Sequence, residues 1–209
     1  MLGALFSVVW CFPAGVEGCG PVPPGLPQTE ERTEREILLR FYAATGGAKG
    51  MWEDTSNWGS ARPLEEWHGV FVDEDGKVDS LILVGNGLEG MIPESLVRLT
   101  GLTALDLKGN RLSGSIPAAL GSLANLDFLD LSRNRLTGAI PIELPHLTRL
   151  RVLCLNHNQL TGSVPEGLGE LPRLEILHLA HNRLQVPSSA TWQHILHREF
   201  QPQRTGKDT

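Results

Sequence analysis

Leucines recur at fixed offsets from residue 78 onward and define a repeating unit. One such unit reads Leu105-x-Leu107-x-x-Asn110-x-Leu112-x-Gly114-x-Ile116-Pro117. Its asparagine returns every 24 residues, at Asn86, Asn110, Asn134, Asn158 and Asn182. A fixed internal period of this length predicts a solenoid, in which each unit buries its apolar face against its neighbours.

Each unit contains two leucines separated by one residue, which predicts a short strand. The two leucines point inward and the residue between them points outward, because alternate side chains of a strand face opposite sides. A buried asparagine donates and accepts hydrogen bonds, so the asparagine column is expected to satisfy backbone groups where the chain leaves each strand. The inward pairs are Leu81/Leu83, Leu105/Leu107, Leu129/Leu131, Leu153/Leu155 and Leu177/Leu179.

The 24-residue unit resembles the plant-type leucine-rich repeat, L-x-x-L-x-L-x-x-N-x-L-x-G-x-I-P-x-x-L-x-x-L, from Val78 to about Leu196. The resemblance implies an α/β solenoid that forms a right-handed arc. It also implies a parallel β-sheet on the concave side and 3₁₀ or irregular turns on the convex side. Proteins with this repeat include receptor-like signalling proteins, so the resemblance favours a recognition role.

Residues 35–71 resemble the helical N-terminal capping region of this family. The matching residues are Glu36-Ile37-Leu38-Leu39, Phe41-Tyr42, Thr45-Gly46-Gly47, Trp52, Asn57-Trp58 and Trp67-His68-Gly69-Val70. The plant receptor pattern places a disulfide-forming cysteine pair where this chain has Glu65 and Val72. The cap is therefore expected to hold by packing of its three tryptophans, since large aromatic side chains bury roughly 150–250 Å² each.

The capping helix has sequence signals at both ends. Thr33 and Glu36 form a capping-box pattern at its expected start. Gly46-Gly47 marks its expected end.

The pattern divides the chain into four segments. Residues 1–28 hold an apolar start, Leu2–Phe12, and a proline-rich linker, and residues 29–77 form the cap. Residues 78–196 hold five repeats, of which the last is degenerate and caps the solenoid, and residues 197–209 are expected to be disordered. At the junction the spacing of apolar residues predicts a short amphipathic helix, carried by Trp192, Ile195, Leu196 and Phe200.

Composition fits a soluble domain, with 41% hydrophobic and 20% charged residues. The net charge of −6 arises before the repeats: residues 1–79 carry 13 acids and 6 bases, whereas residues 80–187 carry nine of each. The absence of a basic domain argues against a nucleic-acid partner. The Leu2–Phe12 run is too short to span a bilayer, and we expect a monomer.

The signals for the cellular compartment conflict. Leu2–Phe12 has the length of a secretory signal core, with a cut before Cys19, although no basic residue precedes Arg32. The three cysteines include no pair placed to bridge the folded part, and none of the asparagines lies in an N-x-Ser/Thr context. Because secreted repeat domains usually carry disulfides, these absences favour a cytoplasmic location over secretion.

Function is expected on the outward side chains of the concave sheet, because the fold alone does not specify it. This mixed strip fits a protein or peptide ligand. Phe128, Arg133 and Arg135 are its expected anchors, because interface energy concentrates in aromatic and arginine side chains. The full set of expected partner contacts is Phe128, Asp106, Asp130, Arg133, Arg135, Lys108, His157, His178 and His181.

Two alternative functions stay open. One is a secreted recognition protein, similar to a receptor ectodomain or to the inhibitors of wall enzymes built from this repeat. The other is a metal- or pH-responsive module that uses the zinc-capable group Cys154, His157, His178 and His181. Neighbouring strands bring these side chains together in two pairs, but the pairs lie on different rows of a flat sheet.

Catalysis is not expected. The sequence has no glycine-rich phosphate loop, no H-E-x-x-H and no G-x-S-x-G. Asp106 and Asp130 are neighbours on the predicted sheet, but an open sheet gives an acid/base pair no pocket walls. No cofactor is expected either.

Overall fold

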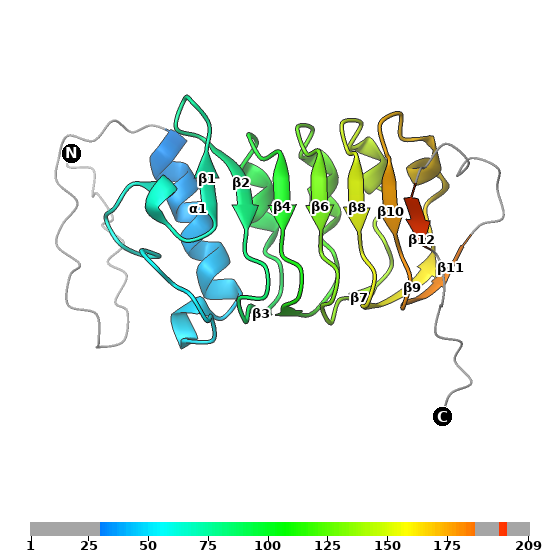
Figure 1. Cartoon of the computed structure of the whole chain (residues 1–209), viewed down its shortest axis with the longest axis horizontal. Helices are drawn as coiled ribbons and strands as arrows, with labels where there is room; N and C mark the ends of the chain where they lie inside the picture. The colour runs from blue at the N-terminus through cyan, green and yellow to red at the C-terminus, as the bar shows by residue number, and fades with distance from the viewer. Residues whose placement is uncertain (1–29, 187–196, 200–209) are drawn as a thin grey trace, which may run out of the picture.

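The N-terminal cap consists of one helix, two 3₁₀ turns and one strand. The computed structural model describes residues 30–186 and 197–199, which are coloured in Figure 1. The cap elements are α1 (Glu30–Ala44), η1 (Gly47–Lys49), η2 (Leu64–Glu66) and β1 (Val70–Val72).

Helix α1 begins earlier than the sequence predicts. It starts at Glu30, so the expected capping box at Thr33 is wrong and Thr33 lies inside the helix. The run from residue 30 to 36 consists mostly of Glu and Arg, which are good helix formers, and this favours the earlier start. The predicted end is confirmed, because α1 stops at Ala44 and Gly46 follows with φ 87, a left-handed conformation that glycine adopts without strain.

A seven-stranded sheet forms one side of the molecule, in the order β1-β2-β4-β6-β8-β10-β12 (Figure 1). The repeat strands pair in parallel at offsets of one period, so Leu81 lies beside Leu105 and Leu105 beside Leu129. The predicted parallel sheet is confirmed, whereas the antiparallel pairing of β1 with β2 was not predicted. The bounds are β2 Val78–Ile82, β4 Ala104–Asp106, β6 Phe128–Asp130, β8 Val152–Cys154, β10 Ile176–His178 and β12 His197–Glu199.

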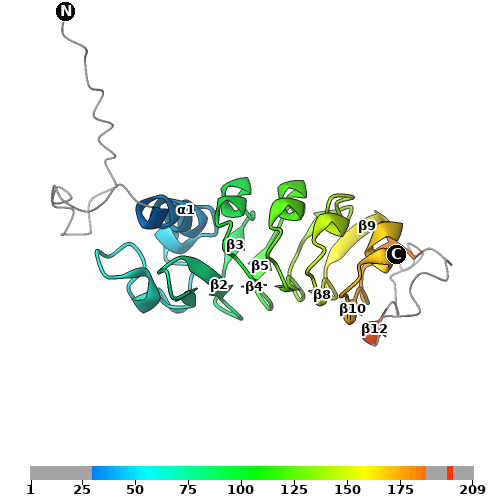
Figure 2. The same cartoon turned by 90° about the horizontal axis from the view of Figure 1, so that it is seen from above.

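Short 3₁₀ helices line the side opposite this sheet (Figure 2). Three of them start directly after a proline, at Pro93, Pro117 and Pro165, as expected for a residue that discourages a longer helix. The helices are η3 (Glu94–Arg98), η4 (Ala118–Ser122), η5 (Leu144–His146) and η6 (Glu166–Glu170). Short parallel ladders connect the two sides: β3 (Glu89–Gly90) with β5 (Arg111–Leu112), and β7 (Thr137–Gly138) with β9 (Gln159–Ser163) and β11 (Arg183–Gln185).

The leucine columns form one continuous core, as the repeat predicts. Both leucines of every strand pair are fully buried, and they belong to the same apolar cluster as the leucines that close each unit. Full burial of one such side chain stabilises the fold by roughly 1.5–3 kcal/mol. Successive units therefore hold one another through their shared interior.

The asparagine column forms the predicted hydrogen-bond ladder. Asn110 donates from Nδ2 to the carbonyls of Leu83 (2.7 Å) and Leu107 (2.9 Å), and its Oδ1 accepts the N–H of Leu88 (3.0 Å). Asn134, Asn158 and Asn182 repeat this arrangement one unit further on each time. Each asparagine thus bonds backbone groups of its own unit and of the unit before it.

The first asparagine, Asn86, joins the cap to the repeats. Its Oδ1 accepts the N–H of Asp54 (2.6 Å), and its Nδ2 donates to the Asp54 carbonyl (2.9 Å). The cap loop therefore takes the place that a preceding repeat would occupy.

The cap tryptophans pack together, which confirms the expected substitute for the missing cysteine pair. The ring centres of Trp52 and Trp58 lie 4.8 Å apart, and those of Trp58 and Trp67 lie 5.1 Å apart. All three rings are buried. The Nε1–H of Trp52 donates to the Thr45 carbonyl (2.8 Å) and that of Trp58 to the His68 carbonyl (2.9 Å), so burial leaves these donors satisfied.

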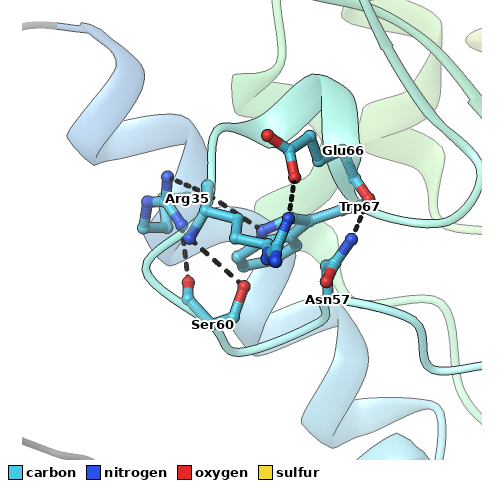
Figure 3. A network of polar contacts seen from close by, with 6 residues as sticks. Arg35, Asn57, Ser60, Glu66 and Trp67 are labelled. Carbon is cyan, nitrogen blue, oxygen red and sulfur yellow. Dashed lines mark hydrogen bonds and ion pairs between the residues drawn. The ribbon is translucent and has the colours of Figure 1, made fainter.

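Arg35 binds helix α1 to the loop that carries the tryptophans (Figure 3). Its guanidinium donates to the carbonyls of Ser60 and Arg62, both at 2.9 Å, and lies 5.0 Å from the centre of the Trp67 ring. A cation over an aromatic face adds to the hydrogen bonds, and Arg35 therefore holds both the backbone and the side chains of this loop.

A buried carboxylate makes a further link between the cap and the sheet. Glu34 accepts the N–H of Val78, the first residue of β2, at 2.9 Å from Oε2. The two residues are 44 positions apart, and both are buried. No periodic pattern identifies such a contact, because it occurs once in the chain.

The C-terminal end of the sheet differs from the expectation. Residues 197–199 were assigned to a disordered tail and to the end of an amphipathic helix, but they form β12, which pairs in parallel with β10. Ile176 lies beside His197, an offset of 21 residues instead of 24, so the last unit is three residues shorter than the others. Trp192, Ile195, Leu196 and Phe200, which were expected to form the amphipathic helix, lie outside the described residues, as does the remainder of the tail.

Candidate functional site

The outward side chains of β1, β2, β4, β6, β8 and β10 form a surface that we call the strand face. Strand register aligns these side chains in rows that cross the strands. The apolar row joins one outward residue from each strand, and its members are Phe71, Ser80, Ala104, Phe128, Val152 and Ile176. The polar row joins the outward residues two positions later on the repeat strands: Ile82, Asp106, Asp130, Cys154 and His178.

Exposed apolar side chains gather at the cap end of the strand face. Phe71 is 51% exposed, Ile82 40% and Val84 50%. Phe71 pairs with Ser80, so its ring faces the same side as the outward residues of β2. The sequence analysis did not select Phe71, although the buried Val70 before it is the strand signal that would have oriented it outward.

Phe128 lies in the middle of the apolar row, as the sequence predicts. Its pairing partners are Ala104 and Val152, and its ring is half-buried. Phe71 and Phe128 stand three strands apart, about 14 Å at the usual strand spacing. The row therefore presents two aromatic rings with smaller side chains between them.

Asp106 and Asp130 lie side by side in the polar row. Burial raises the pKa of Asp106, the Asp130 carboxylate raises it further, and the Lys108 backbone N–H, which donates to Asp106 at 3.1 Å, opposes the rise. The raised pKa means that the ionised form of Asp106 is less stable here than in water. A cationic group from a ligand would stabilise that form.

Two members of the polar row are less accessible than the sequence analysis assumed. Asp130 is 6% exposed and Cys154 is 8% exposed, although both point away from the leucine core. Both stand on central strands, between neighbours on both sides, and Asp130 also accepts the N–H of Ser132 at 2.8 Å. Asp130 therefore has little surface left for the partner contact predicted for it.

The histidines and Cys154 form two separate pairs. The rings of His157 and His181 stack with their centres 4.0 Å apart, and Cys154 Sγ lies 3.8 Å from His178 Nδ1. Both predicted neighbour relations are confirmed. Within residues 30–186 and 197–199, no three side chains of metal-binding type converge on one point, so the zinc alternative gains no support.

The expected arginine anchors lie at one border of the strand face. Arg133 precedes the ladder asparagine of its unit and is exposed. Arg135 follows that asparagine, and its backbone N–H donates to the Leu112 carbonyl (2.8 Å), which places it beyond the strand on the flank of the solenoid. Lys108, also exposed, lies two residues after the end of β4.

The opposite border carries an ion-paired group that the sequence analysis did not select. Arg151 binds the carboxylate of Glu175 at 2.9 Å and lies 4.0 Å from Asp127. Glu175, followed by Asp127, raises the pKa of Arg151. These residues come directly before the outward residues of β6, β8 and β10. Because one guanidinium faces two carboxylates, this border stays acidic.

Two family models match the chain. One, described as leucine rich repeat, matches residues 77–136, and one, described as leucine rich repeats in two copies, matches residues 148–189. No curated protein matches the sequence.

Several solved structures of plant proteins are similar to this chain. A chain of the BIR3–SERK2 complex from Arabidopsis thaliana is 36% identical, with a TM-score of 0.65 over 73% of this chain and 84% of that chain. The Arabidopsis HAESA ectodomain, solved with the IDA peptide hormone, is 31% identical, with a TM-score of 0.67 over 80% of this chain and 28% of that chain. A plant ice-binding protein is 32% identical, with a TM-score of 0.66 over 74% of this chain; the match spans 49% of that protein, about half its length.

The repeat, the fold and these similarities define the class of protein. The chain belongs to the leucine-rich-repeat family, and its repeats are of the plant type. Its repeat domain is homologous to the ectodomains of plant receptors. Among the residues that the structure describes, none of the helices is long and apolar enough to cross a membrane.

Proposed function

We propose that this protein recognises another protein or a peptide through its strand face, with Phe128 as the central anchor. The observation that carries the proposal is the apolar row, which crosses six strands in register and holds Phe71 and Phe128 outward. A contiguous apolar surface rimmed by polar side chains is typical of an interaction site. Interface energy concentrates in aromatic and arginine side chains of this kind.

The similar structures support recognition of this type. One is a complex of BIR3 with SERK2, and another contains HAESA with a bound peptide hormone. In this protein, Lys108 and Arg133 provide charged contacts at one border of the face, together with Arg135 on the flank. Asp106 provides an acidic contact beside the apolar row, and His157, His178 and His181 provide polar contacts at the far end.

The test is capture of partners by the immobilised chain from an extract of the source organism, followed by affinity measurement with the purified partner. Phe128→Ala should weaken binding at least about tenfold, as expected for a central aromatic anchor. The thermal midpoint should change by only a few degrees, since the ring is half-buried.

Ile142→Ala is the matched control, because Ile142 is an exposed apolar side chain in the turn before η5, away from the strand face. This variant should bind as the unaltered chain does. Equal binding by Phe128→Ala and the unaltered chain would rule out the strand face as the recognition surface.

A further inference from the structure

Charge is separated across the strand face, from one end of the strands to the other. The five segments that follow the inward leucine pairs, residues 84–88, 108–112, 132–136, 156–160 and 180–184, contain no Asp or Glu. They carry five exposed cations, which we call the basic edge: Lys108, Arg111, Arg133, Arg135 and Arg183. In a chain whose net charge is −6, this edge is a local concentration of the opposite sign.

The basic edge is only partly balanced by the protein itself: Lys108 attracts Asp106, and Arg111 on β5 is paired in register with Glu89 on β3. No side chain of the five lies within ion-pair distance of an acidic side chain among the described residues. Arg151, at the other border, contrasts with them because it binds Glu175 and lies near Asp127. The five cations are thus available to an external anionic group.

The acids of the strand face lie at the opposite ends of the strands or in the middle row. They are Asp79, Asp106, Asp127, Asp130 and Glu175. A uniformly charged polyanion spread over the face would be repelled by Asp106, whose carboxylate already has a raised pKa through burial. A ligand with acidic groups on one side only avoids this repulsion.

We infer that the ligand is an extended acidic peptide segment that crosses the strands, with its acidic side chains on the basic edge and its other side on the apolar row. The inference rests on the proposed function and names the chemistry of its partner. An extended peptide places alternate side chains on opposite sides, about 6.6–6.8 Å apart along each side. Neighbouring strands of the sheet lie about 4.7–4.9 Å apart. The acidic side chains of the peptide are therefore spaced more widely than the strands, and the long Lys and Arg side chains can reach across this mismatch.

A labelled decapeptide of alternating Glu and Ala is the probe, and fluorescence anisotropy with the full chain is the measurement. The peptide should bind, the same peptide with Lys in place of Glu should not, and added salt should weaken binding because exposed charges are screened. The double variant Arg133→Gln with Arg135→Gln should bind about tenfold more weakly, as expected for the loss of two exposed charge contacts.

A matched double variant removes the same charge elsewhere. Arg98→Gln with Arg173→Gln alters exposed residues outside the basic edge, Arg98 on η3 and Arg173 before β10, and should leave peptide affinity unchanged. Arg111→Gln with Arg183→Gln provides a second edge variant in case residue 133 affects folding, and it should also weaken binding. Circular dichroism and thermal midpoints establish that each variant is folded.

The inference is overturned if the Glu peptide does not bind, or if Arg98→Gln with Arg173→Gln weakens binding as much as Arg133→Gln with Arg135→Gln does. It is also overturned if a sulfated oligosaccharide or single-stranded DNA binds as tightly as the peptide and loses affinity in the same variants, because the edge would then be a general polyanion site. In either case Phe128-dependent capture of a partner would still stand, because that comparison alters Phe128 and leaves the basic edge unchanged.

Discussion

The residue before each ladder asparagine adopts the left-handed conformation in all five repeats. Gly85 (φ 60) and Gly109 (φ 72) hold this position in the first two units, and Arg133 (φ 55), His157 (φ 57) and His181 (φ 57) hold it in the last three. Residues other than glycine pay about 1–2 kcal/mol for this conformation. The later repeats therefore carry larger side chains at a conformational cost, and these side chains lie at the border where we propose ligand binding.

Substitutions at Arg133 separate backbone strain from side-chain contacts. Arg133→Gly should leave the free energy of unfolding unchanged or raise it by up to about 1 kcal/mol, because relief of strain offsets the added freedom of the unfolded chain. Arg133→Val should lower it by about 1–2 kcal/mol, because a β-branched residue is disfavoured at positive φ. Urea unfolding measures both, and a loss above 1 kcal/mol for the glycine variant would show that Arg133 stabilises its turn.

Side-chain direction was predictable from the sequence at this scale, and accessibility was not. The 24-residue period orients Asp130 and Cys154 away from the core, and the structure agrees. Their burial depends on the side chains of the adjoining strands, which the period does not describe. Phe71 was missed for a related reason, because β1 lies outside the repeat and has no column to compare it with.

At the scale of elements, the asparagine ladder connects each repeat unit to the next. From Asn110 onward, each ladder asparagine bonds a carbonyl of its own unit and both a carbonyl and an N–H of the unit before it, so it fixes the separation of the two units. This arrangement followed from the sequence because it recurs. The single contact between Glu34 and Val78 did not, because nothing in the sequence relates helix α1 to β2.

Asn134→Leu tests the ladder at the centre of the solenoid. It leaves the buried Leu112 N–H without its partner. It also removes one of two asparagine donors from the Leu107 and Leu131 carbonyls, which keep Asn110 and Asn158. Because a buried polar group without a partner costs about 1–3 kcal/mol, the free energy of unfolding should fall by about 1–3 kcal/mol. Urea unfolding followed by circular dichroism measures the change.

Asn125→Leu is the control for the ladder, because Asn125 is an exposed asparagine outside the column. Asn125→Leu should lower the free energy of unfolding by less than about 0.5 kcal/mol, as for most surface substitutions. Similar losses for the two variants would contradict the stabilising role assigned to the ladder.

At the scale of the whole molecule, stability comes from contacts between neighbouring units. In such an array the free energy of unfolding is close to the sum of one contribution from each unit and one from each interface between units. The cap supplies the first interface through Asn86 and Asp54, and the tryptophan cluster holds that cap together. The repeat predicted this organisation, whereas the shortened last unit and β12 depend on residues that depart from the pattern.

Excision of one complete period tests this organisation. Removal of residues 126–149 joins Asn125 to Leu150 and keeps every column in phase, so the shorter chain should fold cooperatively with a lower thermal midpoint. The excised segment includes Phe128, so partner binding should be lost. Removal of residues 126–137 alone, half a period, should prevent cooperative folding, and equal stability of the two deletions would contradict a stack of matched units.

The reversed direction of β1 also limits how such a chain lengthens over evolutionary time. A stack of similar repeat units has no fixed number of units. A further unit can be added wherever its strand pairs in parallel with the strand at the end of the sheet. Because β1 runs against β2, no further turn continues past the cap on that side. A duplicated unit is therefore compatible with the parallel sheet only downstream of Val78.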